Sequence, residues 1–259
     1  MRSEAMEMLG QTWSGLADLV LPGTCAGCGT AGVPGSLCPA CLGALEALRP
    51  HQVRPTPAPA GLPACVALGG YDGVLREVLL SYKERGRHVL ARALGDWLAG
   101  AVATGIRQAG YPAGTPVLLV PVPDTAAAAR ERYGDHMRRL ARRTAVRLNA
   151  AGWPAGIGAP LLTRPRPDSV HLDAAGRAAE AARAFAPRPR ELARMAAAVG
   201  RGAVVVPVDD ILTTGGTLAA LAAQLRAGGL PVPVAAVLAA TRRRSGPVPR
   251  RGEFCPERP

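Results

Sequence analysis

Two adjacent aspartates, Asp209 and Asp210, stand where the sequence changes from a strand pattern to a helix pattern. The apolar run over residues 203–208 predicts a buried strand, and the Ala- and Leu-rich run over residues 218–227 predicts a helix that ends at Gly228. Because open α/β sheets bind ligands at the carboxyl ends of their strands, this junction is a candidate binding site. Carboxylates accept hydrogen bonds from hydroxyl groups and coordinate magnesium, so the pair suits a sugar diol or a magnesium ion.

The junction itself is a loop of threonines and glycines: Thr213, Thr214, Gly215, Gly216 and Thr217. Such a loop can turn several backbone N–H groups inward, and the start of a helix adds positive potential, so the loop suits a phosphate. A phosphate site beside a diol site indicates a ribose 5-phosphate. The alternative is a tight strand-to-helix turn with a threonine cap. Pro207 cannot donate a ladder hydrogen bond in this strand, which predicts a local bulge.

Four cysteines near the amino end form a second chemical group. They are two Cys-x-x-Cys pairs separated by nine residues: Cys25, Cys28, Cys38 and Cys41. Four thiolates on two short turns can close a tetrahedral zinc shell, as in zinc ribbons, and Gly27 and Gly29 let the first turn direct its amides at the sulfurs. The alternative, a disulfide framework, is disfavoured because no secretory signal is visible and six cysteines are sparse for this length. Since protein fills all four positions, the expected zinc is structural.

Cys65 and Cys255 lie outside this spacing, and we expect structural or incidental roles for both.

Composition limits the partners that the chain suits. Lys83 is the only lysine among 31 basic residues, a bias typical of a genome rich in G and C, so the net charge of +12 supports an anionic partner only weakly. Aromatic residues make up 3% and form no stacking platform for bases. No uninterrupted apolar stretch approaches about 18 residues, so we expect no membrane insertion. Residues 1–19 carry acidic side chains and no apolar signal core, which predicts a short amphipathic helix and a cytoplasmic protein.

The rest of the chain alternates between strand and helix patterns, which predicts an α/β fold with a parallel sheet flanked by helices. Helices are predicted at 73–80, 89–103, about 126–150, 173–185 and 191–199, and strands at 117–122 and 232–239, with a short strand or loop at 161–166. The predicted domains are an amino-terminal helix and zinc ribbon over residues 1–50, a Pro-rich linker over 51–65, the α/β domain over 66–241 and a basic Pro-rich tail over 242–259.

The strand, the acidic pair and the Thr/Gly loop together resemble the phosphoribosyl-pyrophosphate (PRPP) motif of type I phosphoribosyltransferases. In that family the acidic pair takes the ribose 2- and 3-hydroxyls, and the loop wraps the 5-phosphate. The resemblance implies that Asp209 and Asp210 hold ribose as the catalytic pair, that residues 213–217 hold phosphate, and that magnesium is bound with PRPP. It also implies a type I phosphoribosyltransferase fold for the α/β domain.

A four-cysteine ribbon joined to such a domain resembles the ComF family of competence-associated proteins, over about residues 21–240. The segment 80–87 is similar to a Lys-Tyr segment of that family, although Tyr82 here precedes Lys83, and the sequence Val-Pro-Val-Pro over 120–123 matches a strand end. In this fold the loop after residue 123 faces pyrophosphate. The resemblance therefore implies that Lys83, Arg130 and Arg132 donate hydrogen bonds to that group.

The sequence departs from the family pattern at several positions. Asp135 and His136 replace an Asn-Gln pair, and Ser169 and Glu180 stand where Gln and Asn are usual. His136 and His171 belong to no recognisable catalytic arrangement, so we expect them to have surface or core roles.

Three functions remain open at this point. The first is a PRPP-binding protein that serves the uptake or processing of single-stranded DNA together with competence-machinery proteins. The second is an active phosphoribosyltransferase in nucleotide salvage or modification. The third is a PRPP-sensing regulator without catalysis, in which the ribbon is a protein docking surface.

Overall fold

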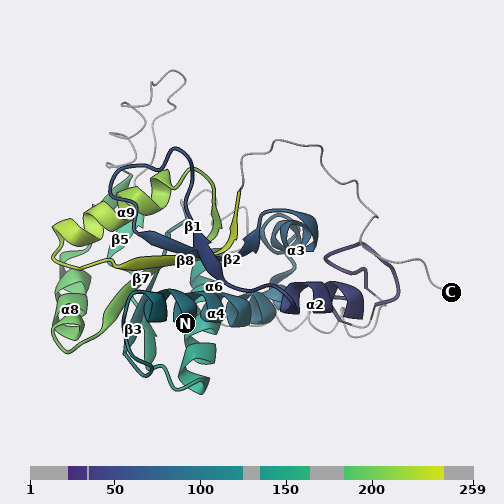
Figure 1. Cartoon of the computed structure of the whole chain (residues 1–259), viewed down its shortest axis with the longest axis horizontal. Coiled ribbons are helices and arrows are strands. Elements are labelled where there is room, and N and C mark those ends of the chain that lie inside the picture. The colour runs from purple at the N-terminus through teal and green to yellow at the C-terminus, as the bar shows by residue number, and fades with distance from the viewer. Residues whose placement is uncertain (1–22, 34, 125–134, 164–183, 242–259) are drawn as a thin grey trace, which may run out of the picture. The chain divides into compact units, whose positions relative to one another are not determined.

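The computed structural model describes residues 23–33, 35–124, 135–163 and 184–241 (Figure 1). The chain divides into two compact units. Of the described residues, 23–33, 35–48 and 72–90 belong to the smaller unit, and 49–71, 91–124, 135–163 and 184–241 belong to the larger. The predicted amino-terminal helix and the basic tail lie outside the described residues.

A six-stranded sheet forms the centre of the larger unit, in the order β1-β2-β8-β7-β3-β4. β1 pairs antiparallel with β2, and every other neighbouring pair is parallel. The strands are β1 (His51–Val53), β2 (Ala64–Gly70), β3 (Val117–Pro121), β4 (Ala155–Ile157), β7 (Val204–Leu212) and β8 (Val234–Ala240). Every residue of β3 and β8 is buried, as expected for strands that are covered on both faces.

Helices cover both faces of this sheet (Figure 1). α4 (Ala91–Gln108) packs against α6 (His136–Ala150), and Gly105 of α4 lies directly against Val66 of β2 and Val234 of β8. Cys65 is adjacent to Val66 and Ala235 is adjacent to Val234, and these two residues instead pack in one cluster with α9 (Gly216–Ala227). Because neighbouring residues of a strand point to opposite faces, α4 and α9 lie on opposite sides of the sheet.

A two-stranded antiparallel sheet and a further helix complete the larger unit. β5 (Leu161–Thr163) pairs with β6 (Phe185–Pro187), and α8 (Pro189–Val199) follows directly. Phe185 and Met195 share one core cluster with Leu221 of α9 and Val205 of β7. This cluster fixes α8 on the face of the sheet that α9 covers.

The described part of the smaller unit contains α2 (Pro39–Glu46), α3 (Gly73–Lys83) and the short 3-10 helix η1 (His88–Leu90). α2 begins with a proline directly after Cys38, a position where the missing amide of proline costs no helical hydrogen bond. α3 buries a continuous apolar side that includes Val74, Val78 and Tyr82.

The coarse fold prediction is confirmed: the chain is α/β with a mostly parallel sheet flanked by helices. The strands predicted at 117–122, 203–208 and 232–239 correspond to β3, β7 and β8. Three short or weakly patterned strands, β1, β2 and β4, were not predicted. β1 lies inside the predicted Pro-rich linker, where an extended chain pairs at the edge of the sheet.

The helix predicted over 173–185 is wrong at its end, because Phe185 begins strand β6. Its preceding Ala-rich pattern favours helix by propensity, whereas Phe185 is buried in the core cluster of α8 and α9. The remainder of that predicted helix lies outside the described residues. The predicted domain boundaries stay predictions.

One described segment, His88–Gln108, is long and apolar enough by composition to cross a membrane. However, 56% of its most apolar stretch is buried inside the protein. Within α4, Leu94, Leu98 and Val102 are fully covered, and the helix packs on β2, β8 and α6. α4 is therefore a core helix of the larger unit. Cytoplasmic location stays a prediction.

Candidate functional site

Asp209 and Asp210 lie near the carboxyl end of β7, a central strand with β8 on one side and β3 on the other. Successive side chains of a strand alternate between faces, so the two carboxylates diverge. Asp210 is 4% exposed, whereas Asp209 is half-buried and its Oδ1 accepts a hydrogen bond from the Asp210 amide at 2.9 Å. The acidic pair therefore presents one carboxylate to each side of the sheet edge.

The bulge predicted at Pro207 does not occur in the described register. β3 pairs with β7 without interruption, with Val120 opposite Pro207 and Pro121 opposite Val208. The pairing of β7 with β8 begins only at Val208. The missing amide of Pro207 therefore interrupts no ladder with β8.

The Thr/Gly loop joins β7 directly to α9, which begins at Gly216. Gly215 has a φ of +78°, a left-handed conformation that favours glycine. A Cβ at this position would lie 3.1 Å from the Leu62 side chain and 3.3 Å from the Pro55 ring. The side chains of Thr213, Thr214 and Thr217 are exposed. No side chain of the described residues caps the start of α9, so its first amides face the loop as a potential anion site.

A cavity of about 280 Å³ adjoins this loop, at the carboxyl ends of β2, β7 and β8. Its lining includes Thr213 from the loop, Arg54 from the segment after β1, and Gly69 and Gly70 from the end of β2. An arginine and a loop threonine thus line one cavity, a pair of residue types that suits an anionic group. The sequence did not reveal Arg54, because β1 was not predicted.

Asp210 takes part in a buried cluster with His136, the second residue of the predicted Asn-Gln replacement. His136 is the first residue of α6, and its Nε2 lies 3.2 Å from Asp210 Oδ2. Its Nδ1 lies 2.6 Å from an oxygen of Asp124, the third residue after β3. The His136 backbone amide also donates to Asp124 at 3.3 Å. One imidazole therefore joins the ends of two adjacent parallel strands.

Electrostatics favour a positive charge on this imidazole. Burial alone would lower the pKa of His136, but the hydrogen bonds with Asp124 and Asp210 and the charges of these carboxylates outweigh it and raise the pKa to about 9. His136 is therefore an imidazolium at neutral pH and compensates part of the acidic charge. Asp135 has a different role: its Oδ1 accepts from the Arg138 amide at 2.8 Å and caps α6.

Sequence reasoning placed His136 in a surface or core role and did not identify Asp124. Only the position of Asp124 shortly after a strand indicated this cluster, because residues that follow parallel strands meet at one edge of the sheet. Asp124 follows β3, and β3 neighbours β7. His171 lies outside the described residues.

The structure does not test the three basic residues that are expected at pyrophosphate. Arg130 and Arg132 lie outside the described residues. Lys83 ends α3 in the smaller unit, whereas the Thr/Gly loop belongs to the larger unit. Their roles stay predictions.

The four cysteines of the smaller unit come together as predicted. The Sγ atoms of Cys25, Cys28, Cys38 and Cys41 all lie within 4.8 Å of one another. The Sγ atoms of Cys28 and Cys38 are 3.8 Å apart. A tetrahedral zinc ion with Zn–S bonds of about 2.3 Å places its sulfurs about 3.8 Å apart. The cluster can hold a metal ion, and its four thiol groups are consistent with a structural zinc.

Backbone amides point at the sulfurs of this cluster, which is the arrangement that stabilises thiolates. The Gly27 amide donates to Cys25 Sγ at 3.4 Å, as expected for the first turn, and the Cys38 amide of the second pair donates to the same sulfur at 3.3 Å. The Gly29 amide instead donates to the Cys25 carbonyl at 2.9 Å. Burial opposes ionisation of Cys28, but its bonds with Thr30 prevail and lower its pKa to about 6. A Cβ at Gly27 would lie 2.8 Å from Cys41 Sγ, so glycine is required for the close approach.

α3 and the segment after it support this cysteine cluster. Ser81 Oγ donates to the Ala26 carbonyl at 3.1 Å, and an Arg87 guanidinium nitrogen donates to the Thr24 carbonyl at 2.6 Å. Arg87 therefore holds the first cysteine turn.

Comparison with models of known protein families finds none that matches the chain, and no curated protein shows significant similarity to it.

Proposed function

We propose that the chain binds PRPP, in a domain with a type I phosphoribosyltransferase fold. The observation that supports this most directly is the junction of β7 and α9. There an acidic pair at the end of a central parallel strand is followed by a Thr/Gly loop with a left-handed glycine and by the uncapped start of a helix.

Each part of this junction has a chemical counterpart in PRPP. The exposed hydroxyls of Thr213, Thr214 and Thr217 and the first amides of α9 are donors for the 5-phosphate. Arg54 borders the same loop and supplies a charge-assisted donor. Asp209 and Asp210 are the acceptors for the ribose hydroxyls, since each carboxylate oxygen can accept more than one hydrogen bond. Magnesium, bound with PRPP, supplies charge neutralisation for its pyrophosphate.

The imidazolium of His136 reduces the electrostatic repulsion between the acidic pair and an anionic ligand. Two aspartates beside a polyanion repel it, and this repulsion weakens binding. His136 lies 3.2 Å from Asp210 and neutralises part of that charge, while it holds the carboxylate in one orientation. Asp124 fixes the imidazole from the opposite side at 2.6 Å.

By resemblance, we propose membership of the ComF family, with a structural zinc in the cysteine cluster and a role in DNA uptake. Active phosphoribosyl transfer and PRPP sensing without catalysis remain the alternatives. The replacement of an Asn-Gln pair by Asp135 and His136 favours a function other than conventional salvage, because both residues have structural partners here.

Calorimetric titration of PRPP with magnesium tests the binding proposal. The variant Asp209→Asn with Asp210→Asn should lose PRPP binding, while its thermal melt stays largely intact. The matched control is Asp96→Asn, which removes an exposed aspartate from α4. An unchanged affinity in the double variant would refute the ribose assignment.

Pyrophosphate release then separates the alternatives. Wild-type protein is incubated with PRPP and, in turn, with nucleobases, amines and single-stranded DNA. Turnover with a base or an amine supports the transferase. Binding of single-stranded DNA without turnover supports the role in DNA uptake, and PRPP binding with neither supports the regulator.

A further inference from the structure

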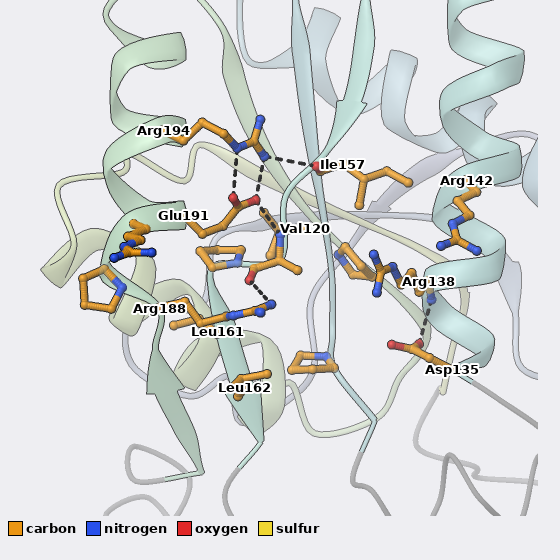
Figure 2. Close-up of a pocket in the computed structure, with 16 residues that line it drawn as sticks. Val120, Asp135, Arg138, Arg142, Ile157, Leu161, Leu162, Arg188, Glu191 and Arg194 are labelled. Carbon is orange, nitrogen blue, oxygen red and sulfur yellow. Dashed lines mark hydrogen bonds and ion pairs between the residues drawn. The ribbon is translucent and has the colours of Figure 1, made fainter. Parts of the chain in front are cut away.

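A second and larger cavity of about 1080 Å³ lies in the larger unit between α6 and α8 (Figure 2). Five arginines line it, two from α6 and three from the start of α8 and the residue before it: Arg138, Arg142, Arg188, Arg190 and Arg194. Its floor comes from β3, β4 and β5. None of the residues 209–217 lines it, so it is separate from the Thr/Gly loop.

The α6 wall carries Arg138 and Arg142, and Asp135, which also lines the cavity, interacts electrostatically with Arg138. Arg138 and Arg142 are four residues apart, so they lie on one side of the helix, and Figure 2 shows both directed toward the cavity. Neither makes an ion pair with any residue in the described ranges. Both are exposed, and Arg143 and Arg147 of the same helix do not line the cavity.

The α8 wall contains one carboxylate, Glu191, and three arginines. Arg194 forms a bidentate pair with Glu191, at 2.6 Å and 2.9 Å. Glu191 also accepts from the Ala159 amide at 3.2 Å, so its charge is used within the wall. An Arg188 guanidinium nitrogen donates to the Ala159 carbonyl at 3.4 Å, and the Arg188 charge also acts on Glu191, which therefore faces two arginines.

Between these walls the lining is apolar. Ile157 of β4 and Leu161 and Leu162 of β5 line the cavity between the two groups of arginines (Figure 2). Leu162 is 50% exposed, one of few large apolar side chains in the described chain that reach solvent. The lining contains five arginines and only two acidic residues, Asp135 and Glu191, so an apolar surface lies beside an excess of positive charge. This combination suits a ligand with an apolar body and anionic groups.

We propose that the cavity between α6 and α8 binds a nucleotide-like ligand, whose phosphoryl groups contact the arginines and whose base or other apolar body covers Leu162. The volume is of the size of small-molecule sites, which are about 300–1,000 Å³. A strand of nucleic acid is less suitable, because no aromatic residue lines this part of the described structure and base stacking is lacking.

The test measures binding of ADP by calorimetry in magnesium-free buffer. The variant Arg138→Gln with Arg142→Gln removes two exposed groups from the cavity. The matched control, Arg143→Gln with Arg147→Gln, removes the same charge from the same helix outside the cavity. Loss of charged hydrogen bonds to phosphate should raise the Kd for ADP at least about tenfold in the first variant, and less than about threefold in the control.

Adenosine and pyrophosphate separate the two halves of the ligand, and both should bind more weakly than ADP. The variant Asp209→Asn with Asp210→Asn should retain ADP binding, so the cavity can be tested even if the PRPP proposal fails. Four results would overturn the inference: no ADP binding to the wild type, equal losses in the two arginine variants, pyrophosphate binding as tight as ADP, or displacement of ADP by oligothymidylate at lower concentration than by ADP itself.

Discussion

The buried cluster of Asp124, His136 and Asp210 provides a quantitative prediction for the variant His136→Gln. The imidazole is 3% exposed, and its nitrogens lie 2.6 Å and 3.2 Å from the two carboxylates. Glutamine leaves two carboxylates in a buried site without the charge that compensates them. Removal of one partner from a buried ion pair costs about 3–5 kcal/mol, so we expect a loss of this size in the free energy of unfolding at pH 7.

The same cluster predicts a pH dependence. The pKa of His136 is raised to about 9 in the folded chain from its ordinary value of 6.5. Because the folded pKa is the higher one, the stabilisation is fully present below about pH 6.5 and is lost as the pH rises through about 9. At 1.36 kcal/mol per pKa unit, this loss amounts to about 3 kcal/mol for the wild type. The His136→Gln variant should not show this pH-dependent loss of stability.

Urea unfolding followed by tryptophan fluorescence measures both effects, since Trp97 and Trp153 lie in the larger unit. The difference in unfolding free energy between wild type and His136→Gln should shrink by about 3 kcal/mol between pH 6.5 and 9.5. His51→Gln, which replaces a histidine of the β1 edge strand, is the control and should follow the wild type. A difference that stays constant across this range refutes the assignment of an imidazolium to the cluster.

Two further predictions concern the cysteine cluster and the Thr/Gly loop. Elemental analysis should find one zinc per chain, and the variant Cys38→Ser with Cys41→Ser should lose it. Because zinc binds thiolates, a chelator should remove the zinc more readily at pH 5.5 than at pH 7.5. Zinc retained in the double variant contradicts the ribbon. Gly215→Ala should cost about 1–2 kcal/mol from its left-handed backbone and should weaken PRPP binding through the contact with Leu62. Gly229→Ala, at the same φ of +78° and with no atom within 4 Å of the added Cβ, should carry the backbone cost alone, and an equal fall in PRPP affinity in both variants counts against the loop as the phosphate site.

The features that could be predicted from the sequence are those encoded in contiguous residues. β3 and β8 are unbroken apolar runs, since helices cover both faces of the sheet. The loop over residues 213–217 and the two Cys-x-x-Cys pairs carry their turn chemistry in their own sequence. Edge strand β1 was missed because its three residues lack a period, and β2 because it is rich in alanine and glycine.

The features that could not be predicted depend on residues that are distant in sequence. His136 and Asp210 are separated by 74 positions, and only the adjacency of β3 and β7 brings them together. Arg142 and Arg188 are likewise distant in sequence, yet both line the cavity between α6 and α8. Arginine is so abundant in this composition that its positions alone distinguish no site.

The central claim is that Asp209 and Asp210 recognise the hydroxyl groups of a ribose 5-phosphate. The direct measurement compares the affinities of ribose 5-phosphate and 2-deoxyribose 5-phosphate for the wild type and for the double Asn variant. Loss of one hydroxyl that bonds to a carboxylate should weaken binding by about tenfold or more in the wild type, and this preference should disappear in the variant. Equal affinities of the wild type for the two sugars contradict the claim.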